Sequence, residues 1–96
     1  MDIEILTAAE SEIDATYHYY ESQDEGLGSQ FLDELLHVLK NIKRYPEAWP
    51  NFSSRTKRCL CSRFPYGVIY QLRKDNILII AVAHLHRKPE YWEDRL

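Results

Sequence analysis

The chain has 96 residues, of which 45% are hydrophobic, and it carries a formal net charge of −3 at pH 7. This length and composition favour one globular domain over residues 1–96 and exclude a disordered chain. The longest apolar run, Ile77 to Ala83, is too short to cross a bilayer, and Asp2 and Glu4 place acid where a signal peptide carries base, so we expect a cytoplasmic protein without membrane contact.

Charge is divided unevenly along the chain. Residues 1–50 hold eleven acidic and three basic residues, whereas residues 51–96 hold four acidic and nine basic residues. The basic half predicts contact with something anionic. The alternative is that the two halves neutralise each other where they meet in the fold.

The N-terminal residues predict a strand followed by a helix. Ile3 to Ile5 form a short strand, which we place at an edge of the sheet. Thr7 and Glu10 have the spacing of a capping box, so a helix should begin there and end near Asp24. Its apolar stripe at helical spacing consists of Ala9, Ile13, Thr16, Tyr17 and Tyr20.

A second helix is predicted from Leu27 or Ser29 to Lys43, after a break at Gly26 and Gly28. Because only three or four residues join the two helices, they should fold back on each other as an antiparallel pair. The predicted buried face of this helix consists of Phe31, Leu35, Val38, Leu39 and Ile42. Expected largely outside that face are Asp33, Glu34, His37 and Lys40.

Residues 46–54 contain two prolines and predict a loop, which Trp49 and Phe52 should pin to the core. Arg55 to Ser62 then predict a strand. One face of this strand carries Lys57, Cys59 and Cys61, and the other carries Arg58 and Leu60.

The segment from Arg63 to Arg87 predicts a β-hairpin around which the rest of the chain is organised. Tyr66 to Leu72 alternate in polarity, as one arm, and Ile77 to Ala83 form an apolar second arm that should be covered on both faces. Asp75 and Asn76 suit the turn between the arms. After the hairpin, Pro89 suits a first helical position, and residues 90–96 should form a short helix.

This order of elements predicts an α+β fold. A helical hairpin should cover one face of a mostly antiparallel sheet of three to four strands, with the N-terminal strand at an edge and a short C-terminal helix. The other sheet face should be open, and an open face is a natural binding surface.

Several residues could carry chemistry at the end of the hairpin. His84, His86 and Arg87 could supply a base, an acid and a phosphate clamp for a nuclease, or one histidine could simply be a hydrogen-bonded residue at the end of the sheet. Tyr66 and Tyr70 could stack on bases, although tyrosines at this spacing also pack under helices.

Cys59 and Cys61 together with His84 and His86 have the ligand types of a zinc site. In a three-stranded meander, however, the central arm would hold the two pairs about 9–10 Å apart. We therefore expect no metal, and we expect no cofactor.

The basic strand, the segment Arg63-Phe64-Pro65-Tyr66 and the exit His84-Leu85-His86-Arg87-Lys88-Pro89 together resemble the RelE/ParE superfamily of bacterial type II toxins (plasmid stabilisation proteins) over essentially the whole chain. The exit is similar to the His-Gly-Arg-Arg-Asp-Pro of the ParE-like branch, but Leu85, His86 and Lys88 depart from that pattern.

The resemblance implies one of two activities. RelE-like members cleave messenger RNA in the ribosome, ParE-like members inhibit DNA gyrase, and both are neutralised by an antitoxin in a hetero-oligomer. Of the positions that carry RelE-like cleavage, Arg58 could replace a lysine, Arg87 matches the exit arginine and Tyr91 lies about two positions from the expected tyrosine. The hairpin arginine falls on Gly67, and a second lysine falls on Leu60.

We therefore predict a ParE-like toxin that binds DNA gyrase and is neutralised by an antitoxin. The alternatives are a RelE-like endoribonuclease that acts on ribosome-bound message and a non-toxic member that only binds an antitoxin. For the nuclease, the candidate residues are Arg58, His84, His86, Arg87 and Tyr91. For binding a partner, they are Arg58, Arg63, Tyr66, Arg87, Tyr91 and Trp92. Arg87 could instead form an ion pair with Glu90 or Asp94.

Overall fold

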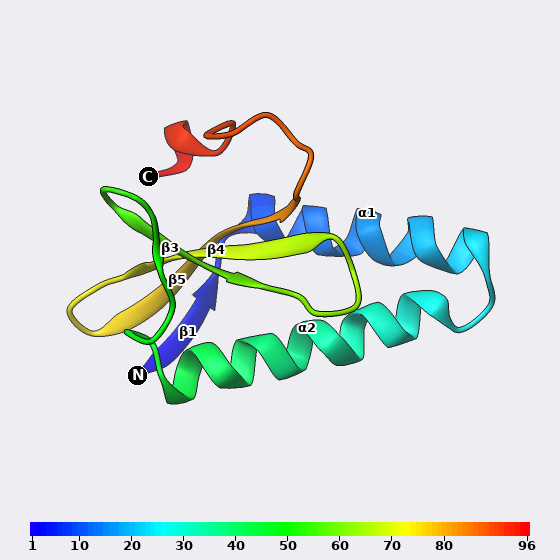
Figure 1. Cartoon of the computed structure of the whole chain (residues 1–96), viewed down its shortest axis with the longest axis horizontal. Helices are drawn as coiled ribbons and strands as arrows, with labels where there is room; N and C mark the ends of the chain where they lie inside the picture. Colours follow the sequence, from blue (N-terminus) through cyan, green and yellow to red (C-terminus); the bar gives the residue numbers. More distant parts are fainter.

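Two helices cover one face of a five-stranded sheet in the computed structural model, which describes residues 1–96 (Figure 1). The order in the sheet is β1-β5-β4-β3-β2, and all neighbours are antiparallel except β1 and β5. The α+β class and the mostly antiparallel sheet are confirmed, and the expected three to four strands are corrected to five. The elements are β1 Asp2–Ile5, α1 Thr7–Gln23, α2 Leu27–Arg44, β2 Asn51–Ser53, β3 Thr56–Leu60, β4 Tyr66–Leu72, β5 Asn76–His84 and a 3-10 turn at Glu93–Arg95.

β1 lies at an edge of the sheet, as predicted, and pairs with β5 in parallel. The chain then passes directly into α1, because the backbone N–H of Leu6 still donates to Ile79 O while Leu6 O accepts from the N–H of Glu10. Leu6 is thus the N-cap residue, and no side chain caps the helix. The capping box expected at Thr7 and Glu10 is therefore wrong, because the continuing strand places Thr7 inside the helix.

The helical hairpin is closed by contacts between its two helices. The carboxylate of Glu21 in α1 accepts hydrogen bonds from the backbone N–H groups of Gly26 and Gly28, at 3.1 and 2.9 Å. Gly26 has a φ of 86°, a left-handed conformation that glycine adopts readily. A Cβ on Gly28 would lie 2.6 Å from Tyr17 O, so the close approach of the helices requires glycine there.

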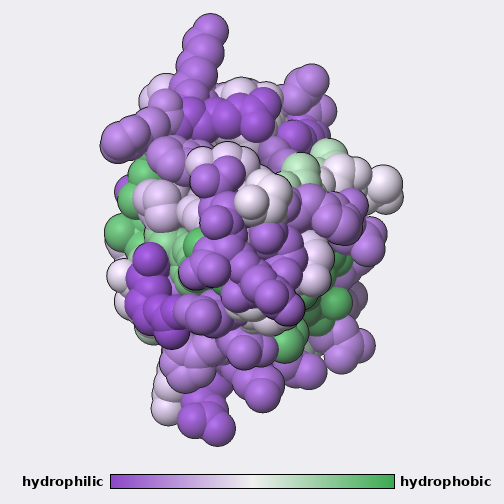
Figure 2. Space-filling model, turned by 90° about the vertical axis from the view of Figure 1, so that its right-hand side faces the viewer, coloured by the Kyte–Doolittle hydropathy of each residue, from purple (hydrophilic) through white to green (hydrophobic).

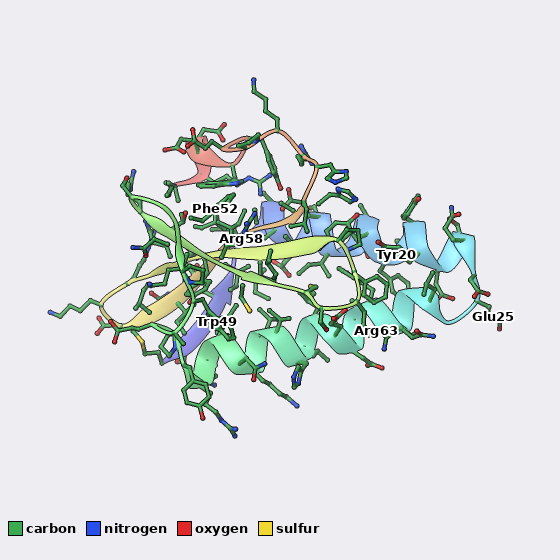
Figure 3. The ribbon with its side chains drawn as sticks, viewed as in Figure 1. Tyr20, Glu25, Trp49, Phe52, Arg58 and Arg63 are labelled. Carbon is green, nitrogen blue, oxygen red and sulfur yellow. The ribbon has the colours of Figure 1, made fainter.

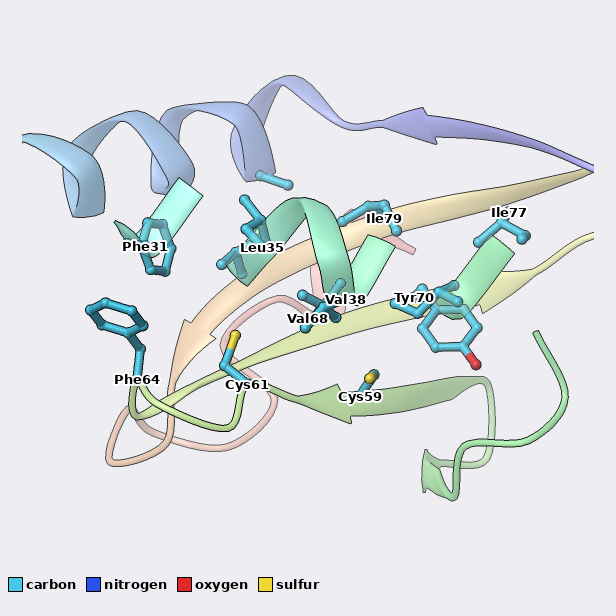
Figure 4. Close-up of a cluster of buried hydrophobic side chains, with 13 residues drawn as sticks. Phe31, Leu35, Val38, Cys59, Cys61, Phe64, Val68, Tyr70, Ile77 and Ile79 are labelled. Atoms are coloured by element: carbon cyan, nitrogen blue, oxygen red, sulfur yellow. The ribbon is translucent and has the colours of Figure 1, made fainter. Parts of the chain in front are cut away.

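The main core lies between the helices and the sheet (Figure 4). Phe31, Leu35, Val38 and Ile42 of α2 are buried there, as their spacing predicted. Leu39 is only partly buried against the cluster. The sheet contributes Cys59, Cys61, Phe64, Val68, Tyr70, Ile77, Ile79 and Val82.

A bulge in β5 divides its apolar run between the two faces of the sheet. The register shifts between Ile69 and Tyr70, which pair with Ala81 and Ile79, so Ile80 has no partner on β4. A bulge of this kind places one extra residue opposite a regular strand. As a result Ile80 and Ala81 both belong to the second cluster, on the face away from the helices.

That second face is not open, which corrects the expectation of an exposed sheet. The C-terminal segment crosses it (Figure 1), and Trp92 is only 1% exposed there. Trp92 packs with Ile69, Leu78, Ile80, Ala81 and Ala83. The seven-residue apolar run of β5 is thus covered on both faces, because the chain ends by folding back over the sheet.

The C-terminal segment and the loop before β3 differ from their predicted forms. Instead of a helix from Pro89, the segment holds only the 3-10 turn, and Glu90 has a φ of 65°, which interrupts helical geometry. Within the predicted loop 46–54, β2 adds an edge strand to β3. Trp49 packs against the main core and Phe52 against the second cluster, so both pin this segment as expected.

The end of the molecule at the tip of the helical hairpin is mainly hydrophilic. Figure 2 looks onto the end that lies on the right in Figure 1, and hydrophobic residues show there only in smaller areas near the margins. Neither helix combines the length and apolar composition that spanning a bilayer would require.

Candidate functional site

A cavity of about 180 Å³ lies where the second sheet face meets the C-terminal segment. It gathers side chains from β2, β3, β4 and the exit of β5, which are far apart in the sequence. Phe52 and Ile69 form apolar walls of this cavity. Five residues that the sequence singled out also line it, namely Arg58, His84, Arg87, Tyr91 and Trp92.

Arg58 projects from β3 across the second face. Its guanidinium carbon lies 4.0 Å from the centroid of the Phe52 ring, and Figure 3 shows the two side chains together beneath the C-terminal segment. The aliphatic stem of Arg58 passes over Gly67, where a Cβ would lie 3.0 Å from Arg58 Cδ. Gly67 therefore leaves room for the Arg58 side chain, which would have to shift if position 67 carried a Cβ.

Arg87 lies at the exit of β5 with its guanidinium carbon 3.8 Å from the centroid of the Tyr91 ring. Its backbone N–H donates to His84 O at 3.0 Å, which fixes the turn that presents the side chain. The alternative of an ion pair with Glu90 or Asp94 is not observed, since the two ion pairs of the structure join other residues.

Glu12 holds the C-terminal segment in place, and the sequence analysis did not single it out. Its carboxylate accepts hydrogen bonds from Tyr91 Oη at 2.5 Å, from both terminal nitrogens of Arg95 at 3.0 and 3.1 Å, and from the backbone N–H of Val82 at 3.0 Å. The sequence does contain a feature that could have identified Glu12. This acid lies three residues after Ala9 and four before Thr16, so it falls on the apolar stripe of α1.

The electrostatics of this network keep Tyr91 neutral and Arg95 charged. Burial, followed by the hydrogen bond and the negative charge of Glu12, raises the pKa of the Tyr91 hydroxyl well above its usual range. The hydrogen bonds to Glu12 raise the pKa of Arg95. The ring of Tyr91 thus serves as a platform for Arg87 while its hydroxyl is committed to Glu12.

The two histidines interact with each other at the end of β5. The backbone N–H of His86 donates to Nδ1 of His84 at 3.0 Å, and the ring centroids lie 5.2 Å apart. His84 also meets the ring of Tyr66 edge to face, at 5.1 Å. The imidazole of His84 therefore already has two partners within the fold, the backbone N–H of His86 and the ring of Tyr66. The side chain of His86, in contrast, is exposed.

Tyr66 and Arg63 do not line the cavity. Tyr66 joins an aromatic cluster beneath the helices, with Tyr20 and Phe31. Arg63 Nη2 donates to Gln30 Oε1 of α2 at 2.6 Å, and Figure 3 shows Arg63 near α2, on the opposite side of the sheet from Arg58. The six predicted partner-binding residues are therefore divided between the cavity and the helical side.

Glu34, predicted on the outer face of α2, instead fastens the loop between β3 and β4. One of its carboxylate oxygens accepts from the backbone N–H and hydroxyl of Ser62 and from the backbone N–H of Arg63, at 2.7, 2.6 and 2.7 Å. Burial raises the pKa of this carboxyl, but the hydrogen bonds from Ser62 and Arg63 outweigh that effect, and the pKa is lowered.

Cys59 and Cys61 are free thiols in the main core. Burial raises the pKa of Cys59 to about 11 and, with the charge of Glu34, that of Cys61 to about 12, so both stay protonated at neutral pH. No group of three or more histidine, cysteine or acidic side chains is arranged to hold a metal ion.

The chain is similar to known proteins at the level of a family and of a fold. The model of a family described as "ParE toxin of type II toxin-antitoxin system, parDE" matches residues 3–89. No curated protein matches the sequence. Among solved structures, the chain is similar to one described as "Chromosomal ParDE TA system from P. aeruginosa", with a TM-score of 0.67 and 14% identity over 88% of this chain and 95% of that chain.

Proposed function

Because the chain belongs to the ParE toxin family of type II toxin–antitoxin systems, we propose that it is a cytoplasmic toxin that acts by binding its target and not by cleaving RNA. The proposed target is DNA gyrase, and the proposed neutralising partner is a cognate antitoxin. The surface that we assign to these contacts is the mouth of the cavity that carries Arg58 and Arg87.

The observation that carries this proposal is Gly67. In the RelE-like branch that the sequence also resembles, this position of the hairpin carries an arginine, which would stabilise the charge that develops on a cleaved phosphate. Loss of such a group typically costs several kcal/mol of transition-state stabilisation. Here a Cβ at position 67 would lie 3.0 Å from Cδ and 3.1 Å from Cγ of Arg58, so a side chain there would fit only if Arg58 shifted.

Two of the remaining nuclease candidates, Tyr91 and His84, are also engaged in the fold, whereas the side chain of His86 is exposed. The hydroxyl of Tyr91 is bound by Glu12, so proton donation to a leaving oxygen would require breaking that contact. Nδ1 of His84 accepts the backbone N–H of His86. Arg58 and Arg87 are cations whose side chains contact aromatic rings, an arrangement that suits recognition of a partner.

Arg87→Ala tests the proposal directly. We expect the wild-type protein to reduce negative supercoiling by purified gyrase and to arrest growth with filamentation when it is induced in bacteria. Arg87→Ala should lose at least tenfold of the gyrase inhibition, because it removes an exposed guanidinium that makes no ion pair in the fold. Arg73→Ala, in the exposed turn between β4 and β5, is the matched control and should inhibit as the wild type does.

RNA cleavage in a reconstituted translation system separates this function from the endoribonuclease. We expect none from the wild type. Codon-specific cleavage of ribosome-bound message that is lost in Arg87→Ala or His84→Ala would replace the proposal with RNA cleavage. A wild-type protein that neither inhibits gyrase nor cleaves message, yet binds an antitoxin, would identify a non-toxic family member.

A further inference from the structure

We propose that the cavity between Arg58 and Arg87 is a pocket for one acidic side chain, and that the antitoxin supplies this side chain. The inference rests on the proposed function, since it requires an antitoxin that covers the same surface. It adds the chemical identity of the group that enters the pocket, and therefore the feature by which the toxin selects its partner.

The first support is an excess of positive charge among the residues that line the cavity. Arg58, Arg87 and Lys88 line the cavity, and no aspartate or glutamate lines it. None of these three cations takes part in an ion pair of the structure. Clefts lined by one sign of charge concentrate ligands of the opposite sign, so the pocket favours an anion.

The second support is that the two arginines are held in place before any ligand arrives. Arg58 lies on the ring of Phe52 and Arg87 on the ring of Tyr91, at 4.0 and 3.8 Å. A guanidinium that lies over an aromatic ring can still donate through its N–H groups, and these match a carboxylate with two parallel hydrogen bonds. Groups ordered in advance lose less freedom on binding, which increases affinity.

The size and the walls of the cavity then restrict the ligand. Its volume of about 180 Å³ is below the roughly 300–1,000 Å³ typical of pockets that hold whole small molecules. The cavity therefore suits a single side chain. Phe52, Ile69 and Trp92 provide apolar walls beside the cations, and the methylene groups of a glutamate can pack on such walls while its carboxylate meets the arginines.

A protein partner fits this pocket better than a nucleic acid does. Binding to nucleic acid depends mainly on several basic residues that follow the phosphate backbone. This chain carries a net charge of −3, and its N-terminal half alone has a balance of −8. The cavity is one local hollow with three cations, so it suits one carboxylate anchored within a larger protein interface.

The test uses the full chain with two blocked peptides, acetyl-Leu-Glu-Leu-amide and its neutral counterpart acetyl-Leu-Gln-Leu-amide. Binding is followed by NMR of the Trp92 indole N–H and the arginine side-chain N–H signals. We expect the glutamate peptide to bind at least tenfold more tightly than the glutamine peptide. Arg58→Gln and Arg87→Gln should each remove this preference, whereas Arg73→Gln, which makes the same change of charge outside the cavity, should leave it unchanged.

Arg87→Lys distinguishes a shaped pocket from a simple attraction of charges. It keeps the positive charge but loses the planar pair of donors, so most of the preference for glutamate should disappear. Full retention of the preference in Arg87→Lys would overturn the pocket. Equal binding of the two peptides by the wild type would overturn it too. So would a loss of the glutamate preference in Arg73→Gln that is as large as the loss in Arg87→Gln. Displacement of the glutamate peptide by single-stranded oligothymidylate at lower concentration would identify a nucleic-acid site instead.

The result can be separated from the proposed function because the titration contains no gyrase. Inhibition of gyrase by a protein that shows no preference for the glutamate peptide would overturn the pocket alone. A clear preference for glutamate in a protein that leaves gyrase unaffected would overturn the proposed target alone.

Discussion

Glu12 is a single residue of α1, and its carboxylate contacts β5, Tyr91 and Arg95. The side chains of Glu12 and Arg95 are only 14% and 20% exposed, so solvent screens their interaction weakly. Tyr91 in turn carries Arg87 on its ring. The candidate site is therefore oriented by an acid that does not itself line the cavity.

We predict that Glu12→Gln lowers the free energy of unfolding by about 1–3 kcal/mol, because hydrogen bonds to a charged and largely buried group are lost or weakened. Urea unfolding followed by circular dichroism measures the change. Asp14→Asn is the matched control, since Asp14 forms only an exposed contact with His18, and it should change stability by less than about 0.5 kcal/mol. An equal effect of both substitutions would show that Glu12 has no special role.

The lowered pKa of the Glu34 carboxyl makes the free energy of unfolding depend on pH in a predictable direction. Its pKa is lowered in the folded state by the hydrogen bonds from Ser62 and Arg63, which outweigh the effect of burial. A carboxyl group whose pKa is lower in the folded than in the unfolded state stabilises the fold above its unfolded pKa, and this stabilisation is lost as pH falls through the folded pKa.

We therefore expect the free energy of unfolding to fall as pH decreases from about 5 to about 3, and to fall less steeply in Glu34→Gln. Asp33→Asn, which changes the neighbouring exposed acid, should keep the slope of the wild type. Parallel profiles for wild type and Glu34→Gln in urea unfolding would contradict the assignment.

At the scale of the element, the helical hairpin depends on how closely α1 and α2 approach each other. Gly28 is buried near the start of α2, where a Cβ would meet Tyr17 O at 2.6 Å and Tyr17 Cδ1 at 2.9 Å. The first of these atoms belongs to the backbone of α1 and cannot turn away. The helices can therefore keep their packing only if position 28 has no side chain.

Glycine to alanine inside a helix normally stabilises a protein by roughly 0.5–1 kcal/mol. We predict the opposite sign for Gly28→Ala, with a loss of about 1–3 kcal/mol from overpacking. Ser29→Ala, on the exposed side of the same turn, should be neutral or slightly stabilising. Thermal unfolding of the two variants provides the comparison, and a more stable Gly28→Ala would show that the helices can separate without cost.

At the scale of the whole molecule, the acidic and basic halves do not neutralise each other through direct ion pairs. Glu12 and Arg95 form the one pair that joins residues 1–50 to residues 51–96, and the other ion pair lies within α1. The hydrogen bonds from Ser62 and Arg63 to Glu34 add a second link. Most of the positive charge of the second half therefore faces solvent or the cavity.

We predict that the cognate antitoxin binds this basic half, with contacts to Arg58, Arg63 or Arg87, and that its association rate falls as salt rises from about 50 to 500 mM, because steering between charged surfaces is screened. Stopped-flow fluorescence measures the rate. The dissociation rate should change much less. An association rate that does not respond to salt would show that the basic half is not a docking surface.

The parts of the fold that follow local patterns could be predicted from the amino-acid sequence. The buried face of α2 follows from residues repeated at the helical period, such as Phe31, Leu35 and Val38, because that period fixes which side chains share a face. The β4–β5 hairpin follows from alternation and from turn-forming residues between the arms. The turn was predicted at Asp75 and Asn76, but it lies at residues 73–75, and Asn76 is already the first residue of β5. The family resemblance came from short segments at the ends of these strands.

The assembly of the candidate site, in contrast, depends on contacts between elements that are distant in the sequence. Arg58, Arg87 and Tyr91 could be chosen from the sequence, but their common cavity depends on the order and register of the strands and on the return of the chain across the sheet. Glu12 lies 79 residues from Tyr91 and 83 from Arg95 in the sequence, so no local period relates them. Contacts of this kind are set by how complete elements pack, which is why the open face was wrongly expected and Glu12 was missed.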